Sequence, residues 1–396
     1  MPIQVFPTPS AGTSYSSQPP ASASSVLLDG QLVTASSIST TVTGTGAPWL
    51  LYANGAGTTT FTIGANNYTV AAGSTVGTSA YTGSQSVTVI APTGSGTPST
   101  FTASTMPGTD AWYSVTFGGG KFVAIASVSS NGAYSADGIN WTTMTMPSAV
   151  GWESVTFGGG KFVAVAQGSS GAYSSNGTTW TTMTMPNGSN WQSVIYGNGY
   201  FVTIAVASST AAYSTNGSTW TTSTLPASAN WFALAYGLIS GTNYYIATNG
   251  TSSNTIAYST NATTWSSATM PSTALWRGIG FGNGTFVVAS NTSAAAYSTD
   301  GTTWSSATMP SSGNWLSIAY GNGYFVAGQS TSGAYSTNGT TWTASTMPSA
   351  SLWRSIAYGN GAFSAVQSSG TTAGAYYSFP PLPVAYGIYN GATVRA

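Results

Sequence analysis

The sequence predicts an all-β protein: a seven-bladed β-propeller of four-stranded antiparallel blades, with a small N-terminal β domain. Two observations support this prediction. A unit of about forty residues recurs from about residue 100 to about residue 380, and four-stranded propeller blades have that length. Within each unit, runs of β-branched and aromatic residues are separated by glycine-containing turns, and no run shows the 3.6-residue apolar period of a helix.

Each unit begins with a tryptophan, and successive opening tryptophans lie 38 to 45 residues apart. In the unit that begins at Trp315, the first strand leads to the turn Gly321-Asn322-Gly323, which supplies the positive φ angles of a tight hairpin. The second and third strands follow, and the fourth strand ends at Met347. The seven opening tryptophans are Trp112, Trp152, Trp191, Trp231, Trp276, Trp315 and Trp353.

The turn before the fourth strand has one sequence signature in six units, as in Ser135–Trp141 and Ser298–Trp304. An Asp or Asn side chain caps such a turn by hydrogen bonds to nearby backbone, and glycine takes the left-handed position. The signature resembles the Asp-box of BNR, or sialidase-like, propellers, although it is one residue shorter and has Asn in four copies. The resemblance implies a structural turn between the third and fourth strands at Asp137, Asn176, Asn216, Asn261, Asp300 and Asn338.

The seventh unit lacks a fourth strand of its own, because it runs from Trp353 only to the break at Phe379-Pro380-Pro381. Residues 101–106 match the fourth strand that begins at Trp342, with Phe101 in place of tryptophan. We therefore expect residues 101–106 to close the last blade of a propeller that spans residues 100–383. Such a closure ties the two ends of the ring together and removes two exposed sheet edges.

The rest of the chain divides by composition. Residues 1–24 are rich in Pro and Ser and predict an extended N-terminal arm, either disordered or docked on another protein. Residues 25–91 contain short β-rich runs between turns, which predict a small β domain with a marginal core of its own. Residues 92–99 have the composition of a linker. Residues 384–396 form an apolar C-terminal tail, for which folding back onto the small domain stays open.

Composition excludes several functions. Charged residues make up 3% of the chain, and there is no Cys and no His, so disulfides, thiolate or imidazole metal sites and Ser-His or Cys-His catalysis are not expected. No metal and no cofactor is predicted. No basic stripe for nucleic acid and no apolar run of eighteen residues for membrane insertion is present.

The resemblance to sialidases also allows a test of enzymatic activity. Sialidases use an arginine triad, a Tyr–Glu nucleophile pair and an acidic Asp, whereas this propeller has two arginines, Arg277 and Arg354, and one glutamate, Glu153. Glycosidases commonly need two carboxylates across one bond, and the five acidic residues here are scattered. We therefore expect no catalytic residues and no enzyme.

One position varies where the rest of the unit repeats: the residue directly after each opening tryptophan. The family fold makes the first strand of each blade the innermost, which places these side chains in a ring near one mouth of the central channel. Such variation fits a ligand site, and it also fits an unconstrained exposed position. The candidate receptor-binding residues are Glu153, Gln192, Phe232, Arg277 and Arg354. A longer hairpin at residues 238–243 points to the opposite face.

The repeat Ala-Tyr-Ser-Thr-Asp-Gly-Thr-Thr-Trp, in a chain rich in Ser, Thr and Gly, resembles phage tail-fibre and virion surface proteins. The resemblance implies a virion protein, exposed on tail or head, whose residues 1–91 attach to other virion proteins. Its propeller would bind a host cell-surface receptor, glycan or protein, with a glycan favoured. Two alternatives remain: a purely structural head decoration or fibre protein, and a secreted propeller lectin. Assembly into a homo-oligomer also stays open.

Overall fold

The computed structural model describes residues 37–55, 59–63, 66–70, 74–90, 96–330, 332–368, 374–379 and 384–390. These residues form strands and connections without an α-helix, so none of them forms a helix that could span a membrane. The chain divides into two compact units. One is Met1–Gly96 together with Phe379–Ala396, and the other is Thr97–Ser378.

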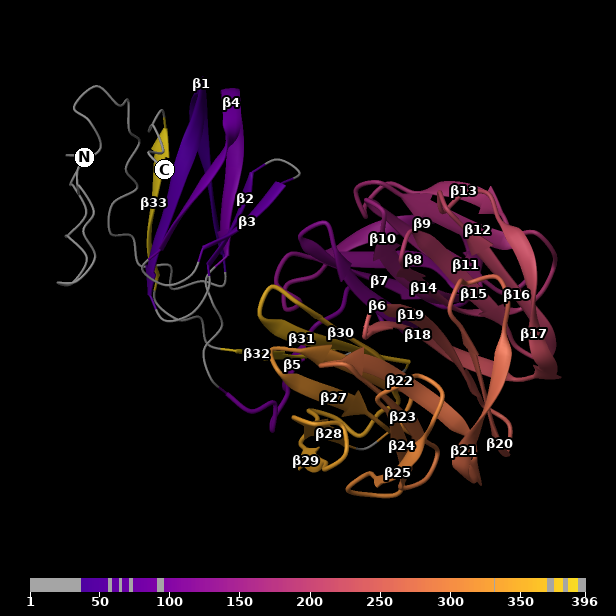
Figure 1. The fold of residues 1–396 in the computed structure, drawn as a ribbon. Helices are drawn as coiled ribbons and strands as arrows, with labels where there is room; N and C mark the ends of the chain where they lie inside the picture. The colour runs from indigo at the N-terminus through magenta and orange to yellow at the C-terminus, as the bar shows by residue number, and fades with distance from the viewer. Residues whose placement is uncertain are drawn as a thin grey trace. The chain divides into compact units, whose positions relative to one another are not determined.

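The second unit is a seven-bladed propeller of four-stranded antiparallel sheets, which confirms the predicted fold class (Figure 1). The first strands are β6 (Trp112–Gly118), β10 (Trp152–Gly158), β14 (Trp191–Gly197), β18 (Trp231–Ile239), β22 (Trp276–Gly282), β26 (Ser317–Gly321) and β30 (Trp353–Gly359). The second strands are β7 (Lys121–Ala126), β11 (Lys161–Ala166), β15 (Tyr200–Ala205), β19 (Thr242–Asn249), β23 (Thr285–Ser290), β27 (Tyr324–Gly328) and β31 (Ala362–Gln367). Blades are numbered 1 to 7 in this order.

The third strands are β8 (Ser129–Ser135), β12 (Ser170–Ser174), β16 (Ser208–Ser214), β20 (Ser253–Ser259), β24 (Ala294–Ser298), β28 (Gly333–Ser336) and β32 (Gly374–Ser378). The fourth strands are β9 (Thr142–Val150), β13 (Thr181–Thr184), β17 (Thr221–Ala229), β21 (Ser266–Ala274), β25 (Ser305–Thr308), β29 (Thr343–Ser345) and, for blade 7, β5 (Thr102–Ser104). Each first strand contacts the first strands of both neighbouring blades, from β6 around to β30 and back to β6. The first strands are therefore the innermost.

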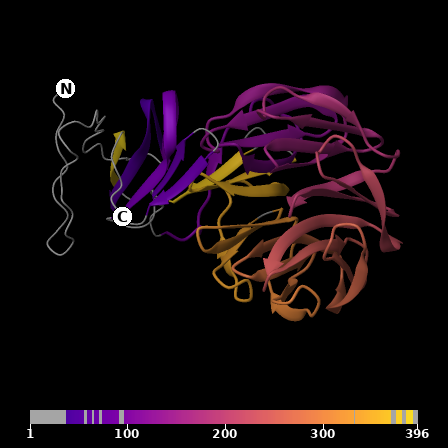
Figure 2. The same cartoon turned by 45° about the horizontal axis from the view of Figure 1, so that its top comes forward.

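Blade 7 is closed by the strand that precedes blade 1. β5 pairs antiparallel with β32, with Thr102 opposite Tyr376 and Ser104 opposite Gly374, as the sequence match predicted. The yellow strands at the end of the repeat accordingly lie beside the purple strands at its start (Figure 2). The side chain of Phe101 is 3% exposed, so the closing segment is anchored by buried apolar surface as well as by sheet hydrogen bonds.

Neighbouring blades meet through a glycine and an aromatic ring at the far end of each innermost strand. Gly158 of blade 2, for example, lies so close to the ring of Tyr196 in blade 3 that a Cβ atom would overlap it. The same contact joins all seven blades, and Gly359 closes the circle against Phe117. Glycine is required here by close approach rather than by a positive φ angle.

The hydrophobic core lies between adjacent blades rather than within one. All seven opening tryptophans are 0% exposed. In one cluster, Trp152 and Phe162 of blade 2 pack with Val123 and Ile125 of blade 1. Each blade therefore buries its apolar side chains only when its neighbour is present, which is how stacked repeats obtain their stability.

The six signature turns share two backbone hydrogen bonds to the Asp or Asn side chain, and in five of them a glycine N–H also donates to the serine hydroxyl, whereas blade 4 has Ala262 in place of that glycine. In the first, the N–H groups of Ile139 and Asn140 donate to Asp137 Oδ1 at 2.9 Å, and Gly138 N–H donates to Ser135 Oγ. Burial acts to raise the pKa of the corresponding Asp300, but the N–H groups of its turn lower that pKa to about 2. Asparagine can take the same place because its amide oxygen accepts the same bonds.

The first unit contains a five-stranded antiparallel sheet. Its strands are β1 (Ser37–Gly55), β2 (Thr59–Ile63), β3 (Asn66–Val70), β4 (Ser74–Ile90) and β33 (Val384–Asn390), in the order β3-β2-β4-β1-β33. Residues 384–390 of the predicted C-terminal tail pair with β1 from Trp49 to Gly55 and form an edge strand, so the tail folds back onto the small domain, as the sequence analysis left open. The predicted arm of residues 1–24 and the start of the predicted small domain lie outside the described residues.

Candidate functional site

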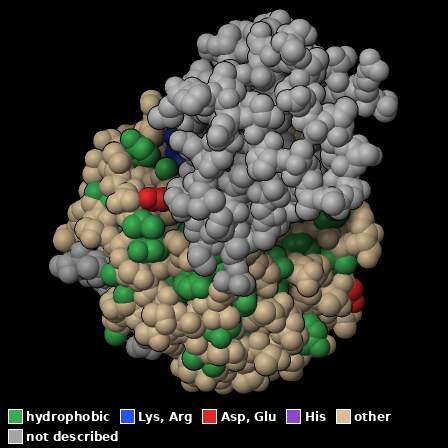
Figure 3. Space-filling view, turned by 90° about the vertical axis from the view of Figure 1, so that its left-hand side faces the viewer, with side chains coloured by type: hydrophobic (Ala, Val, Ile, Leu, Met, Phe, Trp, Pro, Cys, Tyr) green, Lys and Arg blue, Asp and Glu red, His purple; other side chains and the backbone are tan. Residues whose placement is uncertain are grey.

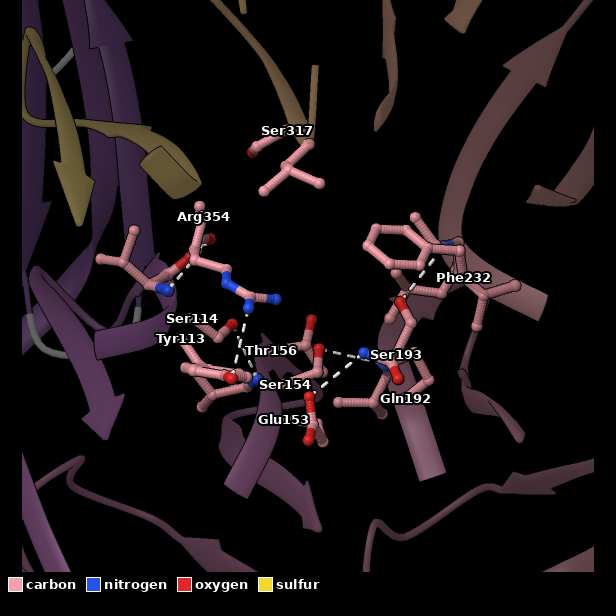
Figure 4. Close-up of a pocket in the computed structure, with 18 of the residues that line it drawn as sticks. Tyr113, Ser114, Glu153, Ser154, Thr156, Gln192, Ser193, Phe232, Ser317 and Arg354 are labelled. Atoms are coloured by element: carbon pink, nitrogen blue, oxygen red, sulfur yellow. Dashed lines mark hydrogen bonds between the residues drawn. The ribbon is translucent and has the colours of Figure 1, made fainter. Parts of the chain in front are cut away.

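The structure brings most of the variable residues together at a cavity in the centre of the propeller. The residue after each opening tryptophan is called here a slot residue. Six of the seven slot residues line a cavity of about 260 Å³ (Figure 4). Other residues of the innermost strands complete its lining. They are Tyr113, Glu153, Gln192, Phe232, Leu316 and Arg354. The seventh, Arg277, does not line the cavity but lies over the ring of Phe232, 5.1 Å from its centroid.

The slot residues face the channel because the innermost strands have a β-bulge there. In blade 2 the pairing with β11 shifts register between Trp152 and Ser154, so that Glu153 is the extra residue. The same shift follows the opening tryptophan in every blade except blade 6, whose β26 begins after Leu316. A bulge redirects a side chain, so the tryptophan can stay in the core while the next residue points into the channel.

Glu153 is a carboxylate held by two amides. Its side chain is 8% exposed, and it accepts hydrogen bonds from Gln167 Nε2 at 2.7 Å and Gln192 Nε2 at 3.1 Å. Burial raises the pKa of Glu153, and the two amides together with the positive charge of Arg354 offset only part of that effect. The bond from Gln192 joins blades 2 and 3 at the wall of the cavity, and the bond from Gln167 holds the carboxylate within blade 2.

The two arginines are each stacked on an aromatic ring of an adjacent blade. The guanidinium of Arg354 lies 4.1 Å from the ring centroid of Tyr113 and donates to its hydroxyl at 3.2 Å. Arg277 stacks on Phe232 in the same manner, and burial and the charge of Arg354 lower its pKa. Stacking fixes the plane of a guanidinium while leaving its edge available. Within the described part of the chain, the Nε atoms of both arginines are buried without a hydrogen-bond partner.

The charges are distributed unevenly around the ring. Glu153 and the amide of Gln192 come from blades 2 and 3, whereas the two arginines come from blades 5 and 7. Aromatic slot residues in blades 1 and 4 separate these two halves. The mouth of the channel is therefore polarised, although the chain as a whole has no net charge.

A second ring, which the sequence analysis missed, holds the cavity wall together. In five blades the residue after the slot is a serine whose hydroxyl accepts an N–H from the next blade at 3.0–3.1 Å. These serines are Ser114, Ser154, Ser193, Ser317 and Ser355. The recurring Trp-x-Ser spacing was the available signal, but a small polar residue in a strand does not by itself indicate a bond between blades.

Blades 4 and 5 depart from the serine pattern, with Ala233 and Gly278 at this position. There, Thr248 Oγ1 donates to the carbonyl of Arg277 at 3.0 Å, and Gly278 N–H donates to the carbonyl of Trp315 at 3.1 Å. The blades that carry Phe232 and Arg277 are thus joined by different contacts. The hydrogen bonds between blades therefore differ at the place where Arg277 stacks on Phe232.

Other predicted features lie elsewhere. The six signature turns follow the third strands, outside the cavity lining. The longer hairpin of blade 4 is at the opposite end of β18 from Phe232, and its Leu238 is 54% exposed. Among the described residues, no group of three or more acidic side chains is arranged to hold a metal ion.

Comparison with known proteins identifies the fold. No family model and no curated protein sequence matches the chain. A solved streptogramin B lyase is similar with a TM-score of 0.62 and 16% identity, over 70% of this chain and 97% of the lyase. A catalytically inactive virginiamycin B lyase from Staphylococcus aureus with quinupristin has a TM-score of 0.60 and 12% identity, over 72% and 98% of the two chains. YCF48 bound to D1 peptide has a TM-score of 0.57 and 16% identity, over 73% and 99%.

These similarities contradict the expectation that the protein is not an enzyme. Two of the similar structures are lyases, so the same propeller fold is found in enzymes. The expectation was wrong because it compared the chain mainly with glycosidases, whose paired carboxylates are not required by every reaction. At 12% and 16% identity the likeness establishes the fold alone, and it assigns no reaction to this chain.

Proposed function

We propose that the chain is a phage virion surface protein whose propeller binds a host cell-surface glycan at the mouth of its channel. The observation that carries the proposal is the convergence of six slot residues on one cavity, in a ring whose glycine–aromatic contacts repeat from blade to blade. Variation confined to one cavity is expected where a ligand, rather than blade packing, determines the side chains.

The lining of the cavity supports a sugar ligand. Hydroxyl, amide and guanidinium groups from Ser154, Gln192 and Arg354 lie next to the aromatic rings of Tyr113 and Phe232. Sugars present hydroxyl groups and apolar faces together, so they match a lining of this mixed kind. The visible propeller surface in Figure 3 carries few charged side chains, which favours short-range contacts over long-range electrostatic attraction.

The virion assignment is supported by the repeats and their turns. The signature turns resemble the Asp-boxes of sialidase-like propellers, and the Ser-, Thr- and Gly-rich repeats resemble phage tail-fibre proteins. Propellers of this fold also include one solved with quinupristin and one bound to a peptide, which supports a ligand-binding role for the fold. Residues 1–91 would attach the protein to other virion proteins, on either tail or head.

The proposal is tested by glycan-array binding of the purified chain and of two variants. Arg277→Ala with Arg354→Ala should weaken binding roughly tenfold to hundredfold, since a lost hydrogen bond to a charged group costs about 1.5–3 kcal/mol. Removal of residues 238–243 should leave binding unchanged, because that hairpin is at the other end of β18. Loss of binding in the hairpin variant alone would place the site on the opposite face. Absence of the protein from purified virions would contradict the virion assignment.

A further inference from the structure

The cavity contains one positive and one negative side chain that do not bond to each other. Figure 4 shows Glu153, from β10, and Arg354, from β30, directed toward the same space. The carboxylate is held by amides of Gln167 and Gln192, and the guanidinium donates to Tyr113. Arg354 therefore acts on Glu153 through its charge. A group placed between the two could accept a hydrogen bond on one side and donate one on the other.

This arrangement disfavours a charged ligand. An anion would be attracted by Arg354 but repelled by Glu153 in the same cavity of about 260 Å³. A cation would be attracted by Glu153 but repelled by Arg354. Charges in a partly buried site interact more strongly than in water, so neither penalty is screened away. A neutral group with an acceptor and a donor on opposite sides satisfies both residues. A secondary amide is such a group, because its carbonyl oxygen accepts and its N–H donates.

The remaining contacts favour a sugar over a peptide as the carrier of that amide. The cavity is smaller than the roughly 300–1,000 Å³ of sites for drug-sized ligands, so it suits one ring with a small substituent. Phe232 and Leu316 provide apolar surface for a methyl group. The hydroxyl of Ser154 accepts an N–H from Val194, and its own proton is left to donate to a sugar hydroxyl.

We infer that the cavity binds an N-acetylated sugar residue, with the acetamido carbonyl at Arg354 and the acetamido N–H at Glu153. This inference rests on the proposed function, since it names the class of glycan that the propeller recognises. Arg277 has an indirect part: it lies over Phe232 without lining the cavity, so it orients the ring instead of contacting the amide.

The test is calorimetric titration of the full chain with matched sugars: N-acetylglucosamine against glucose, and N-acetylgalactosamine against galactose. In at least one pair, the acetylated sugar should bind tenfold or more tightly than its parent. Arg354→Met keeps the length of the side chain but removes its donors, and it should abolish this preference. Lys161→Met, the matched control, removes a positive charge that lies outside the cavity and should retain the preference. Thermal unfolding of both variants shows whether they are folded.

Three results would overturn the inference: equal binding within both pairs, a preference that survives Arg354→Met, or binding of N-acetylglycine methylamide as tight as that of the sugar. The last result would indicate a peptide ligand. If a plain or acidic glycan binds the wild-type chain and not the Arg277→Ala, Arg354→Ala variant, the inference fails and the proposed function stands. If no glycan binds in either assay, both fail.

Discussion

The two ends of the innermost strands differ in how closely their residues agree from blade to blade. At the far end, each blade has a glycine that faces an aromatic ring of the next blade, and this contact is made seven times around the ring. At the near end, the same strands present Tyr113, Glu153, Gln192, Phe232, Arg277, Leu316 and Arg354, among which only arginine occurs twice. Each blade thus carries both a uniform and a varied position, five residues apart in all seven blades.

The difference shows which requirement acts at each end. At the far end a neighbouring blade fills the space above the glycine, so any side chain would overlap its ring. At the near end the bulge turns the slot residue away from the neighbouring blade and into the channel. Packing between blades fixes the first position and leaves the second open to different side chains.

The largest expected loss of stability comes from removing the strand that closes the ring of blades. Deletion of residues 1–107 removes β5 with Phe101 and Met106, which are 3% and 2% exposed, and deletion of residues 1–95 leaves them in place. The loss of these two buried side chains alone should cost roughly 3–6 kcal/mol. Both truncations also remove β1, the partner of β33, so their comparison isolates the closing strand. Equal unfolding temperatures for the two proteins would show that β5 does not stabilise the ring.

A smaller effect is expected from the serine ring at the cavity wall. Ser154→Ala removes the acceptor of the N–H of Val194, a residue that is 3% exposed. A buried donor left without a partner costs about 1–3 kcal/mol, which denaturant unfolding can measure. Ser306→Ala, on the exposed outer strand β25, is the control and should be nearly neutral. A cost no greater than that of the control would mean that the blades are held at this end by other contacts.

The smallest expected effect is a pH-dependent change in unfolding temperature when Glu153 is replaced. Burial raises the pKa of Glu153 in the folded protein above its ordinary value of 4.5, so folding favours the protonated form. The stabilisation that comes from this shift is fully present below the pKa of Glu153 in the unfolded state, and it is lost as the pH rises through the pKa in the folded state. Glu153→Gln should therefore unfold at a higher temperature than the wild type at pH 7, and the gap should narrow toward pH 4. A gap that stayed constant or widened on acidification would contradict this prediction.

Much of the fold could be predicted from sequence because the same unit occurs several times, so a strand that is missing from one copy can be recognised by comparison with the others. The match of residues 101–106 to the strand after Trp342 located the closing strand, which pairs with β32 as expected. The pairing of β33 with β1 could not be located in the same way, because residues 384–390 have no counterpart in the repeat and long-range pairing is not encoded by local pattern.

The candidate site was predictable in position but not in detail. A fixed spacing after tryptophan identified the slot residues, because equivalent positions in a rotational repeat must lie on one ring. Which of them line the cavity depends on side-chain contacts between blades: Arg277 is turned aside by stacking on Phe232. The hydrogen bond from Gln167 to Glu153 was also missed, since Gln167 lies in the connection after β11 and has no special spacing in the repeat.

The account is tested most directly by changing both ends of β30 separately and measuring stability and glycan binding for each variant. Gly359→Ala introduces a Cβ against the ring of Phe117, and overpacking of this kind costs about 1–3 kcal/mol. It should lower the unfolding temperature and leave the affinity of the folded protein unchanged. Arg354→Met should do the reverse, with affinity reduced tenfold or more and the unfolding temperature lowered less than by Gly359→Ala. If both substitutions changed stability alone, or if Gly359→Ala abolished binding by the folded protein, the division between a packing end and a binding end would be contradicted.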